Sequence, residues 1–269
     1  MDNNSSDNSY DVLSEWKEHN ESEDFRIDLY QETIPGACAA RNLALKHIDS
    51  EWTMFFDSDD TMPKDHVKRA LKESQIHPDA QIIGWARRIH LKNGKVLIKK
   101  FRTRNPEYEN LTQSICATQN YMAKTSLFNE AGGWDNRIKV GQDIEIGSRL
   151  LKLKPNLLLI KNHFIDVYET PLSITNSTKN GMREMKYTLD KIRGTFPKDK
   201  NHWIDLQLII KAASWGKDDP DSPEIVKEIL NKTSPRRRWL WRLFYLYQLN
   251  GGRGVARIYS LLHFNRMHL

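Results

Sequence analysis

The stretch Trp52-Thr53-Met54-Phe55-Phe56-Asp57-Ser58-Asp59-Asp60 governs how the rest of the sequence is interpreted. An apolar run that stops at three carboxylates is typical of a buried strand ending at a ligand site, because open α/β sheets bind ligands at the carboxyl ends of their strands. Like charges this close repel, and a divalent cation such as Mg²⁺ or Mn²⁺ would relieve the repulsion and could bridge a diphosphate. The other interpretation is a solvated acidic turn before a helix at Pro63. The stretch alone leaves both open.

Strand and helix signals alternate around this stretch. A helix rich in small residues is predicted over 36–47, and Asn93-Gly94 predicts a hairpin. Strands are also expected at 25–29, 80–85, 121–123 and 157–160, with helices at 63–75, from about 125, and at 142–152. Further helices are expected at 182–192, 202–213, 223–230 and 236–249. This order predicts an α/β domain with a mixed sheet over residues 1–178 and a C-terminal helical extension over 179–269.

Composition limits the class of protein. The chain has 269 residues, a hydrophobic fraction of 39% and a net charge of +6, which fits a globular domain with a real core. It has no apolar run of about 18 residues and no visible signal peptide at Met1. Only Cys38 and Cys116 are present, so no disulfide framework is expected and the sequence predicts a reducing, cytoplasmic setting.

The C-terminal part is basic and aromatic. From Arg236 to Leu269 there are seven arginines and no acid, interleaved with Trp239, Trp241 and Phe244. Such a helix can lie on the inner face of a membrane with its arginines at the headgroups. It can equally be a terminal helix whose aromatic residues pack on the domain. Nucleic acid is not an expected partner, because no reading module accompanies the charge.

A second signal follows the acidic turn. Gly132-Gly133-Trp134-Asp135 is followed shortly by Gly141-Gln142-Asp143-Ile144-Glu145. Asp143 would open a helix, where the dipole keeps a carboxylate ionised and able to accept a proton. In isolation, Asp143 could also be an ordinary first-turn acid, and Trp134 could simply plug the core.

Together these segments resemble a known family. The run Ala40-Arg41-Asn42-Leu43-Ala44-Leu45, followed by a strand ending in Asp57-Ser58-Asp59, is similar to the core of family 2 glycosyltransferases with its Asp-x-Asp motif. The segments 132–135 and 141–152 resemble that family's acceptor loop and catalytic helix. The opening Asp2-Asn3-Asn4-Ser5-Ser6-Asp7 is similar to its turn beside the nucleobase. The resemblance covers roughly residues 1–168.

The resemblance implies a nucleotide-diphospho-sugar transferase (GT-A) fold and inverting transfer of a sugar to a saccharide or lipid-linked acceptor, with surface polysaccharide synthesis as the expected pathway. Asp143 would be the catalytic base. Asp57 and Asp59 would hold Mn²⁺ or Mg²⁺, with Asp60 a lesser candidate. The other expected roles are nucleotide binding for Asp2, Arg41 and Asp57, and acceptor binding for Trp134 and Asp135.

Three departures from the family pattern stand out. The chain begins inside the expected Asp-rich turn, so about 30 residues of family pattern, including a central strand, are expected to be missing; we infer a truncated gene, a misplaced start or a fragment. Gln142 stands where the family usually has Glu. Tyr168-Glu169 stands where the family often has a histidine that can bind metal, and His163 is expected to be a surface or packing residue.

Two alternatives remain open on the sequence. The first is a catalytically inactive relic, or a non-catalytic interaction protein, because the expected segment is missing. The second keeps the fold but changes the chemistry, as in a sugar-1-phosphate nucleotidyltransferase. Such enzymes usually carry a Gly-rich basic loop after their first strand, in a region that this sequence does not contain.

Overall fold

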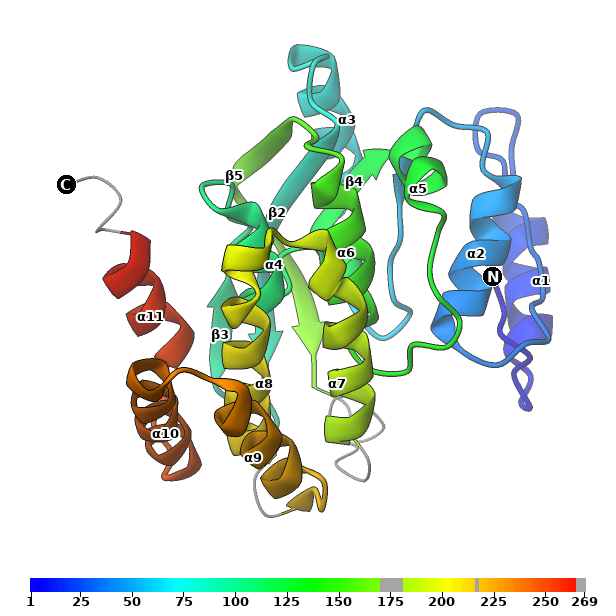
Figure 1. Cartoon of the computed structure of the whole chain (residues 1–269). Coiled ribbons are helices and arrows are strands. Elements are labelled where there is room, and N and C mark those ends of the chain that lie inside the picture. Colours follow the sequence, from blue (N-terminus) through cyan, green and yellow to red (C-terminus); the bar gives the residue numbers. More distant parts are fainter. Residues whose placement is uncertain (170–180, 216–217, 265–269) are drawn as a thin grey trace.

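A computed structural model describes residues 1–169, 181–215 and 218–264 of the chain. Its centre is a mixed five-stranded sheet flanked by helices (Figure 1). The strands are β1 (Trp52–Met54), β2 (Ile82–His90), β3 (Val96–Lys99), β4 (Tyr121–Lys124) and β5 (Leu157–Tyr168). The expected α/β class with a mixed sheet is confirmed.

Strand β2 is the hub of the sheet. Along one edge it pairs in parallel with β5 over its whole length. Its other edge is shared: residues 82–84 pair with β4, and residues 87–90 pair with β3, both antiparallel. Strand β1 pairs with β4. This order brings the carboxyl end of β1, where the acidic loop begins, near the start of β4 and the end of β5.

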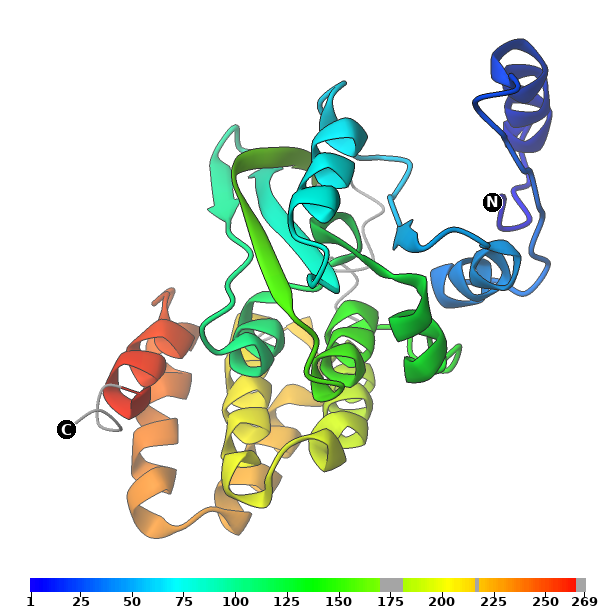
Figure 2. The ribbon, with the colours of Figure 1, turned by 90° about the horizontal axis from the view of Figure 1, so that it is seen from above.

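Successive residues of the strands point to opposite faces of the sheet, as the pleat requires. Ile82 joins a core with helices α2 (Ala37–His47), α5 (Thr125–Ala131) and α6 (Gln142–Lys152). Ile83 joins a second core, with Ala70 of helix α3 (His66–Ile76). Figure 2 shows α3 on one side of the sheet and α6 on the other.

The C-terminal helices form a further layer that packs on α4 (Pro106–Gln113) and α6. They are α7 (Gly181–Ile192), α8 (His202–Trp215), α9 (Ser222–Lys232), α10 (Pro235–Leu249) and α11 (Val255–Phe264). Their largest core also contains Tyr108 and Leu111 of α4 and Ile144 of α6. The boundary expected between residues 178 and 179 lies outside the described residues. No described helix is long and apolar enough to cross a bilayer.

The main differences from the expected elements lie in the N-terminal region. Residues 25–29 form no strand: Phe25 is 55% exposed and makes only an isolated bridge to Ser22. Alternation of polar and apolar residues was not sufficient there, because no neighbouring strand offers hydrogen bonds. Helices α1 (Ser9–Asn20), α4 and, at the other end of the chain, α11 were not expected. Helix α1 buries none of its residues, and it lies away from the sheet beyond α2 (Figure 2).

Candidate active site

The acidic loop after β1 is held in place by one glutamine. Gln119 donates from Nε2 to Oδ2 of Asp57 at 3.0 Å and to Oδ2 of Asp60. The other oxygen of Asp60 accepts the backbone N–H of Tyr168, at the end of β5, at 3.1 Å. Asp59 is exposed and forms no hydrogen bond or ion pair within the described part of the chain. One carboxylate of the loop is therefore free to meet a ligand.

Burial and mutual repulsion disfavour the charges of this loop. The pKa of Asp57 is raised, chiefly by loss of solvation, although Arg41 opposes the shift; the charges of Asp143 and Asp59 add to it. The pKa of Asp60 is raised for the same first reason. A cation bound here would lower the free energy of these carboxylates, whereas a solvated turn would not raise their pKa.

Arg41 of α2 joins the acidic loop to the second motif. Its Nη2 donates to Oδ1 of Asp57 at 2.8 Å and its Nη1 to Oε1 of Gln142 at 3.3 Å. Its guanidinium carbon lies 5.9 Å from the ring centroid of Trp134. Although burial lowers the pKa of Arg41, the charges of Asp143 and Asp57 more than offset it, so the net pKa is raised.

Asp143 lies in the first turn of α6, after Gly141 in the left-handed conformation. A Cβ at Gly141 would lie 3.2 Å from Thr188 of α7, and its φ of +80° also disfavours side chains, so the turn requires glycine. Oδ1 of Asp143 accepts the hydroxyl of Thr118 at 2.9 Å. Oδ2 has no hydrogen-bond partner among the residues that the structure describes, so it is available to accept a proton.

Trp134 and Asp135 are both tied into the fold. Trp134 is 5% exposed and packs on Phe128 and Phe55, with ring centroids 5.3 and 4.7 Å away. Asp135 forms ion pairs with Arg137 at 2.8 Å and with Lys191 of α7 at 2.6 Å. The bond to Arg137, together with Lys191, holds the pKa of Asp135 well below its usual range. Acceptor binding by these two residues stays a prediction. In the structure Trp134 packs against Arg41, and Asp135 is held by its ion pair with Lys191.

Asp2 lies in a separate network. Its carboxylate accepts the hydroxyl of Ser5 and, at 2.9 Å, the side-chain amide of Gln31. These bonds lower its pKa. Its main chain bridges to Tyr30 and Glu32, which shapes the turn. None of its hydrogen bonds reaches the group around Arg41, and its role beside a nucleobase stays a prediction.

Tyr168 is the last residue of β5, the position at which the family often has a histidine. Its backbone contacts Asp60 as described, and its ring stacks on His90 with centroids 4.8 Å apart. His163 is 1% exposed and stacks on His66, with a 2.6 Å hydrogen bond between the rings. The expectation of a packing histidine is confirmed. Burial lowers the pKa of His163, and it lowers that of His66 to about 4.

The donor set is suited to a divalent cation that a substrate helps to bind. Within the described residues no three His, Cys, Asp or Glu side chains converge as a complete metal cage. Mg²⁺ commonly takes only one or two carboxylates together with substrate phosphates. Exposed Asp59 and the partly exposed Asp57, both carboxylates, fit that arrangement.

Sequence patterns did not identify several residues of the site. Thr118 and Gln119 lie in a short 3-10 helix (Thr118–Asn120) just before β4 and are 4% and 8% exposed. Buried polar residues before a strand were the only signal. Gln142, noted as a departure, contacts Arg41 directly. Cys38 and Cys116 are buried, and loss of solvation raises the pKa of Cys38 to about 11, so neither is poised as a nucleophile.

Known proteins resemble this chain in two ways. Residues 1–130 match the sequence model of glycosyl transferase family 2. A comparison with curated proteins gives no match. The fold is similar to residues 1–349 of S. aureus TarS in complex with UDP-GlcNAc, with a TM-score of 0.57 and 14% identity, over 92% of this chain and 71% of that one. It is also similar to the mannosyltransferase PcManGT from Pyrobaculum calidifontis, in complex with GDP-Man and Mn²⁺, with a TM-score of 0.56 and 15% identity, over 97% and 76%. The chain therefore has the fold of GT-A glycosyltransferases.

Proposed function

We propose that this protein is an inverting, metal-dependent glycosyltransferase, because residues 1–130 match the sequence model of glycosyl transferase family 2. It would move a sugar from a nucleotide-diphospho-sugar to a saccharide or lipid-linked acceptor. The observation that carries the proposal is the convergence on Arg41: this guanidinium bonds Asp57 and Gln142, and the charge of Asp143 acts on it. Arg41 thus contacts both motifs, which lie far apart in the sequence, and this supports a single site.

The donor would lie on the side of Arg41 and the acidic loop. Arg41 is suited to the diphosphate, because a guanidinium binds phosphate oxygens with two parallel hydrogen bonds. Asp57 and Asp59 would hold Mn²⁺ or Mg²⁺, and Asp2 would contact the nucleobase. When bound, the metal supplies Lewis-acid stabilisation of the charge that grows on the departing nucleoside diphosphate.

Asp143 would act on the acceptor. Thr118 fixes Oδ1, so Oδ2 is directed to take the proton of an acceptor hydroxyl. The acceptor oxygen then forms its bond to the anomeric carbon as the bond from that carbon to the diphosphate breaks. A single displacement of this kind inverts the anomeric configuration. Trp134 and Asp135 would border the acceptor, and Trp134 would also hold Arg41 in position.

Calorimetric titration with UDP and GDP, with and without Mn²⁺, tests the proposed donor site. Binding of either nucleotide that requires the metal is the expected result. A folded protein that binds neither nucleotide would contradict the proposal and favour an inactive relic or an interaction protein. The comparison of UDP with GDP would also give the base of the donor.

Helix α10 supports a contact with a membrane surface, which would suit lipid-linked acceptors in surface polysaccharide synthesis. Trp241 and Phe244 pack inward, at 1% and 9% exposure, but Trp239 and Leu246 are 65% and 52% exposed. Arginines such as Arg242 flank this outer face. Sedimentation with vesicles containing phosphatidylglycerol should therefore pull down the protein, and Trp239→Ala should weaken that binding.

Equal sedimentation with vesicles of neutral phosphatidylcholine would contradict an electrostatic contact of this kind. Leu13→Ala is a suitable control, because that side chain is also exposed and apolar but lies on α1. If both variants weakened binding equally, the contact would not be specific to α10.

A further inference from the structure

The main chain of Gln119 is anchored to the centre of the sheet. Gln119 lies in the 3-10 helix Thr118–Asn120, directly before β4, and is only 8% exposed. Its backbone carbonyl accepts the indole N–H of Trp85, in β2, at 2.7 Å. Trp85 is itself fully buried. The side chain of Gln119 therefore starts from a point of the backbone that is fixed relative to the sheet.

The side-chain amide of Gln119 binds two carboxylates at once. Its Nε2 has two N–H groups, and they donate to Oδ2 of Asp57, at 3.0 Å, and to Oδ2 of Asp60. Each acid is also held at its other oxygen: Arg41 donates to Oδ1 of Asp57, and the backbone of Tyr168 donates to Oδ1 of Asp60. Gln119 is thus the donor that the two acids share, and it fixes the distance between them.

The bridge that Gln119 makes is electrically neutral. Lys191 also bridges two acids, Asp135 and Glu145, at 2.6 and 2.7 Å, but it brings a positive charge that offsets part of theirs. An amide holds carboxylates together without such an offset. Among the described residues only Arg41 forms an ion pair with the acidic loop, so its three carboxylates retain a net negative charge. That charge attracts a cation.

We propose that Gln119 is the positioning residue of the acidic loop: it sets the spacing of Asp57 and Asp60 before a ligand arrives and leaves their charge for a divalent cation. Holding like charges together in advance costs free energy in the folded protein, and a metal-bound diphosphate recovers it on binding. Gln119 acts through the two acids and is not assigned a contact with the substrate. This inference rests on the proposed function, because it concerns how the donor site is prepared.

Gln119→Met tests the positioning through nucleotide binding. Methionine has a similar length but no N–H group, so Asp57 and Asp60 lose the donor that they share. Binding of UDP or GDP with Mn²⁺, measured by calorimetry, should weaken by about tenfold. Gln207→Met is the matched control, because Gln207 of α8 is also a buried glutamine, 3% exposed. It should change the affinity by less than about twofold, and equal affinities of the two variants would overturn the proposal.

Gln119→Glu separates an effect of charge from an effect of packing. Glutamate has nearly the same shape, but it places another carboxylate against the two acids, so the metal-free variant should unfold at a lower denaturant concentration than the wild type. Mn²⁺ alone should raise the denaturant midpoint of Gln119→Glu more than that of the wild type, because the cation relieves the added repulsion. Gln207→Glu makes the same change of charge on α8 and should show no such additional rise.

The two measurements keep failure of this inference apart from failure of the proposed function. If the wild type binds neither UDP nor GDP, the response of Gln119→Glu to Mn²⁺ still decides whether Gln119 prepares the acids for a cation. If the wild type binds nucleotide with Mn²⁺ but the two glutamate variants respond alike to the metal, the donor site stands and the role of Gln119 is refuted. A role in packing alone would give that second result.

Discussion

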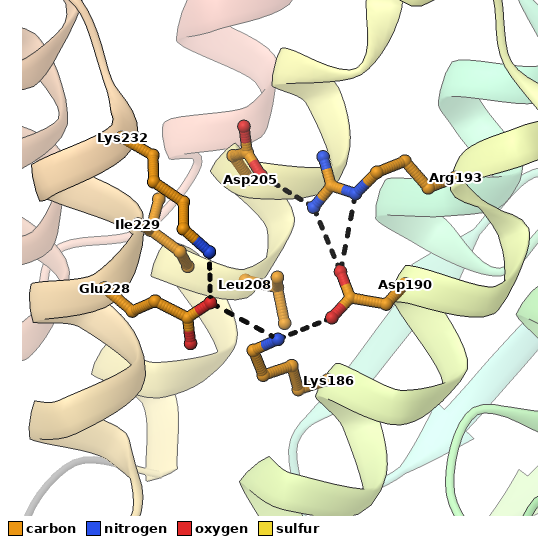
Figure 3. Close-up of a pocket in the computed structure, with 8 residues that line it drawn as sticks. All are labelled: Lys186, Asp190, Arg193, Asp205, Leu208, Glu228, Ile229 and Lys232. Atoms are coloured by element: carbon orange, nitrogen blue, oxygen red, sulfur yellow. Dashed lines mark hydrogen bonds and ion pairs between the residues drawn. The ribbon is translucent and has the colours of Figure 1, made fainter.

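Two regions of this molecule shift the pKa of a lysine in opposite directions. Lys186 lies in a recess of about 340 Å³ between α7, α8 and α9, where it contacts Asp190 at 2.5 Å and Glu228 at 3.7 Å. Figure 3 shows these contacts continuing to Lys232 on one side and through Arg193 to Asp205 on the other. The hydrogen bond to Asp190 raises the pKa of Lys186. Lys99 of β3 has a lowered pKa, chiefly through loss of solvation, and it forms no ion pair within the described part of the chain.

We expect this difference to separate charges that serve the fold from charges that bind a ligand. In the recess, cations and acids alternate, so each charge is neutralised by the protein itself. In the candidate active site, like charges are grouped in the acidic loop, where loss of solvation and the charges of Asp143 and Asp59 raise the pKa of Asp57. Grouped like charges lower stability, and a substrate or metal of opposite charge recovers that free energy on binding.

The largest expected effect comes from Asp143, the candidate base. Asp143→Asn should lower the rate of sugar transfer by about 10²- to 10⁴-fold, because the amide cannot accept the proton. Nucleotide binding with Mn²⁺, measured by calorimetry, should stay nearly unchanged. Full turnover in this variant would show that another group is the base.

Removing the free carboxylate of the acidic loop should have the next largest effect. Asp59→Ala should weaken Mn²⁺-dependent binding of UDP or GDP by about tenfold or more, because it removes a charged ligand without breaking any hydrogen bond of the described fold. The control is Asp24→Ala, an exposed acid of equal charge on a different loop. If both variants bound the nucleotide alike, Asp59 would not be a metal ligand.

Loosening the candidate base should have a smaller effect on the rate. Thr118→Val removes the bond to Oδ1 of Asp143 and should lower kcat by about tenfold. The KM for the donor should not change. Thr118→Ser keeps the hydroxyl and should restore most of the rate. If the serine variant were as slow as the valine variant, the cause would be packing.

Lys99 should make the free energy of unfolding depend on pH. Because the pKa of Lys99 is about 8 in the folded protein and its ordinary value is 10.5, the folded state holds fewer protons in this interval. The free energy of unfolding should therefore gain a contribution as the pH rises from 8 to 10.5. The denaturant midpoint of the wild type should therefore rise relative to that of Lys99→Gln over this range, while Lys100→Gln should follow the wild type.

The smallest effect is expected in the recess. Glu228→Gln removes contacts to Lys186 and Lys232, but the Lys232 side chain is 74% exposed, so water screens that pair. The free energy of unfolding should fall by less than about 1 kcal/mol, and transfer should not change. Glu224→Gln, on the same helix, is the matched control. A loss of transfer in Glu228→Gln alone would contradict the division between fold and ligand charges.

Sequence patterns predicted those residues of the candidate site that stand in a recognisable local motif. The acidic run at Asp57, the helix of Arg41 and the helix start at Asp143 could all be recognised locally, and with them the sheet class. Local patterns failed for residues 25–29, because a strand needs a partner that local alternation cannot reveal. They also could not show that Gln119 spans two aspartates, because that contact depends on how β4 meets β1 and β5.

Lys99 of β3 and Lys211 of α8 illustrate the same limit. Both are ordinary lysines in the sequence, and only the folded chain brings the charge of Lys211 close enough to help lower the pKa of Lys99. The pattern of helices 182–249 was predicted almost in full, but patterns of one helix say nothing about which sheet it covers. Tertiary packing therefore determines the surroundings of these two lysines, and local patterns could not predict them.

The core that Tyr108, Leu111 and Ile144 share with the C-terminal helices has a consequence for engineering. A chimera that exchanges residues 181–264 for the tail of another transferase would face α4 and α6 with side chains of unmatched shape. Such a swap must carry those three positions with it. Changes in the tail and in these two helices therefore depend on one another, and the tail cannot change its packing surface independently of α6, the helix that contains Asp143.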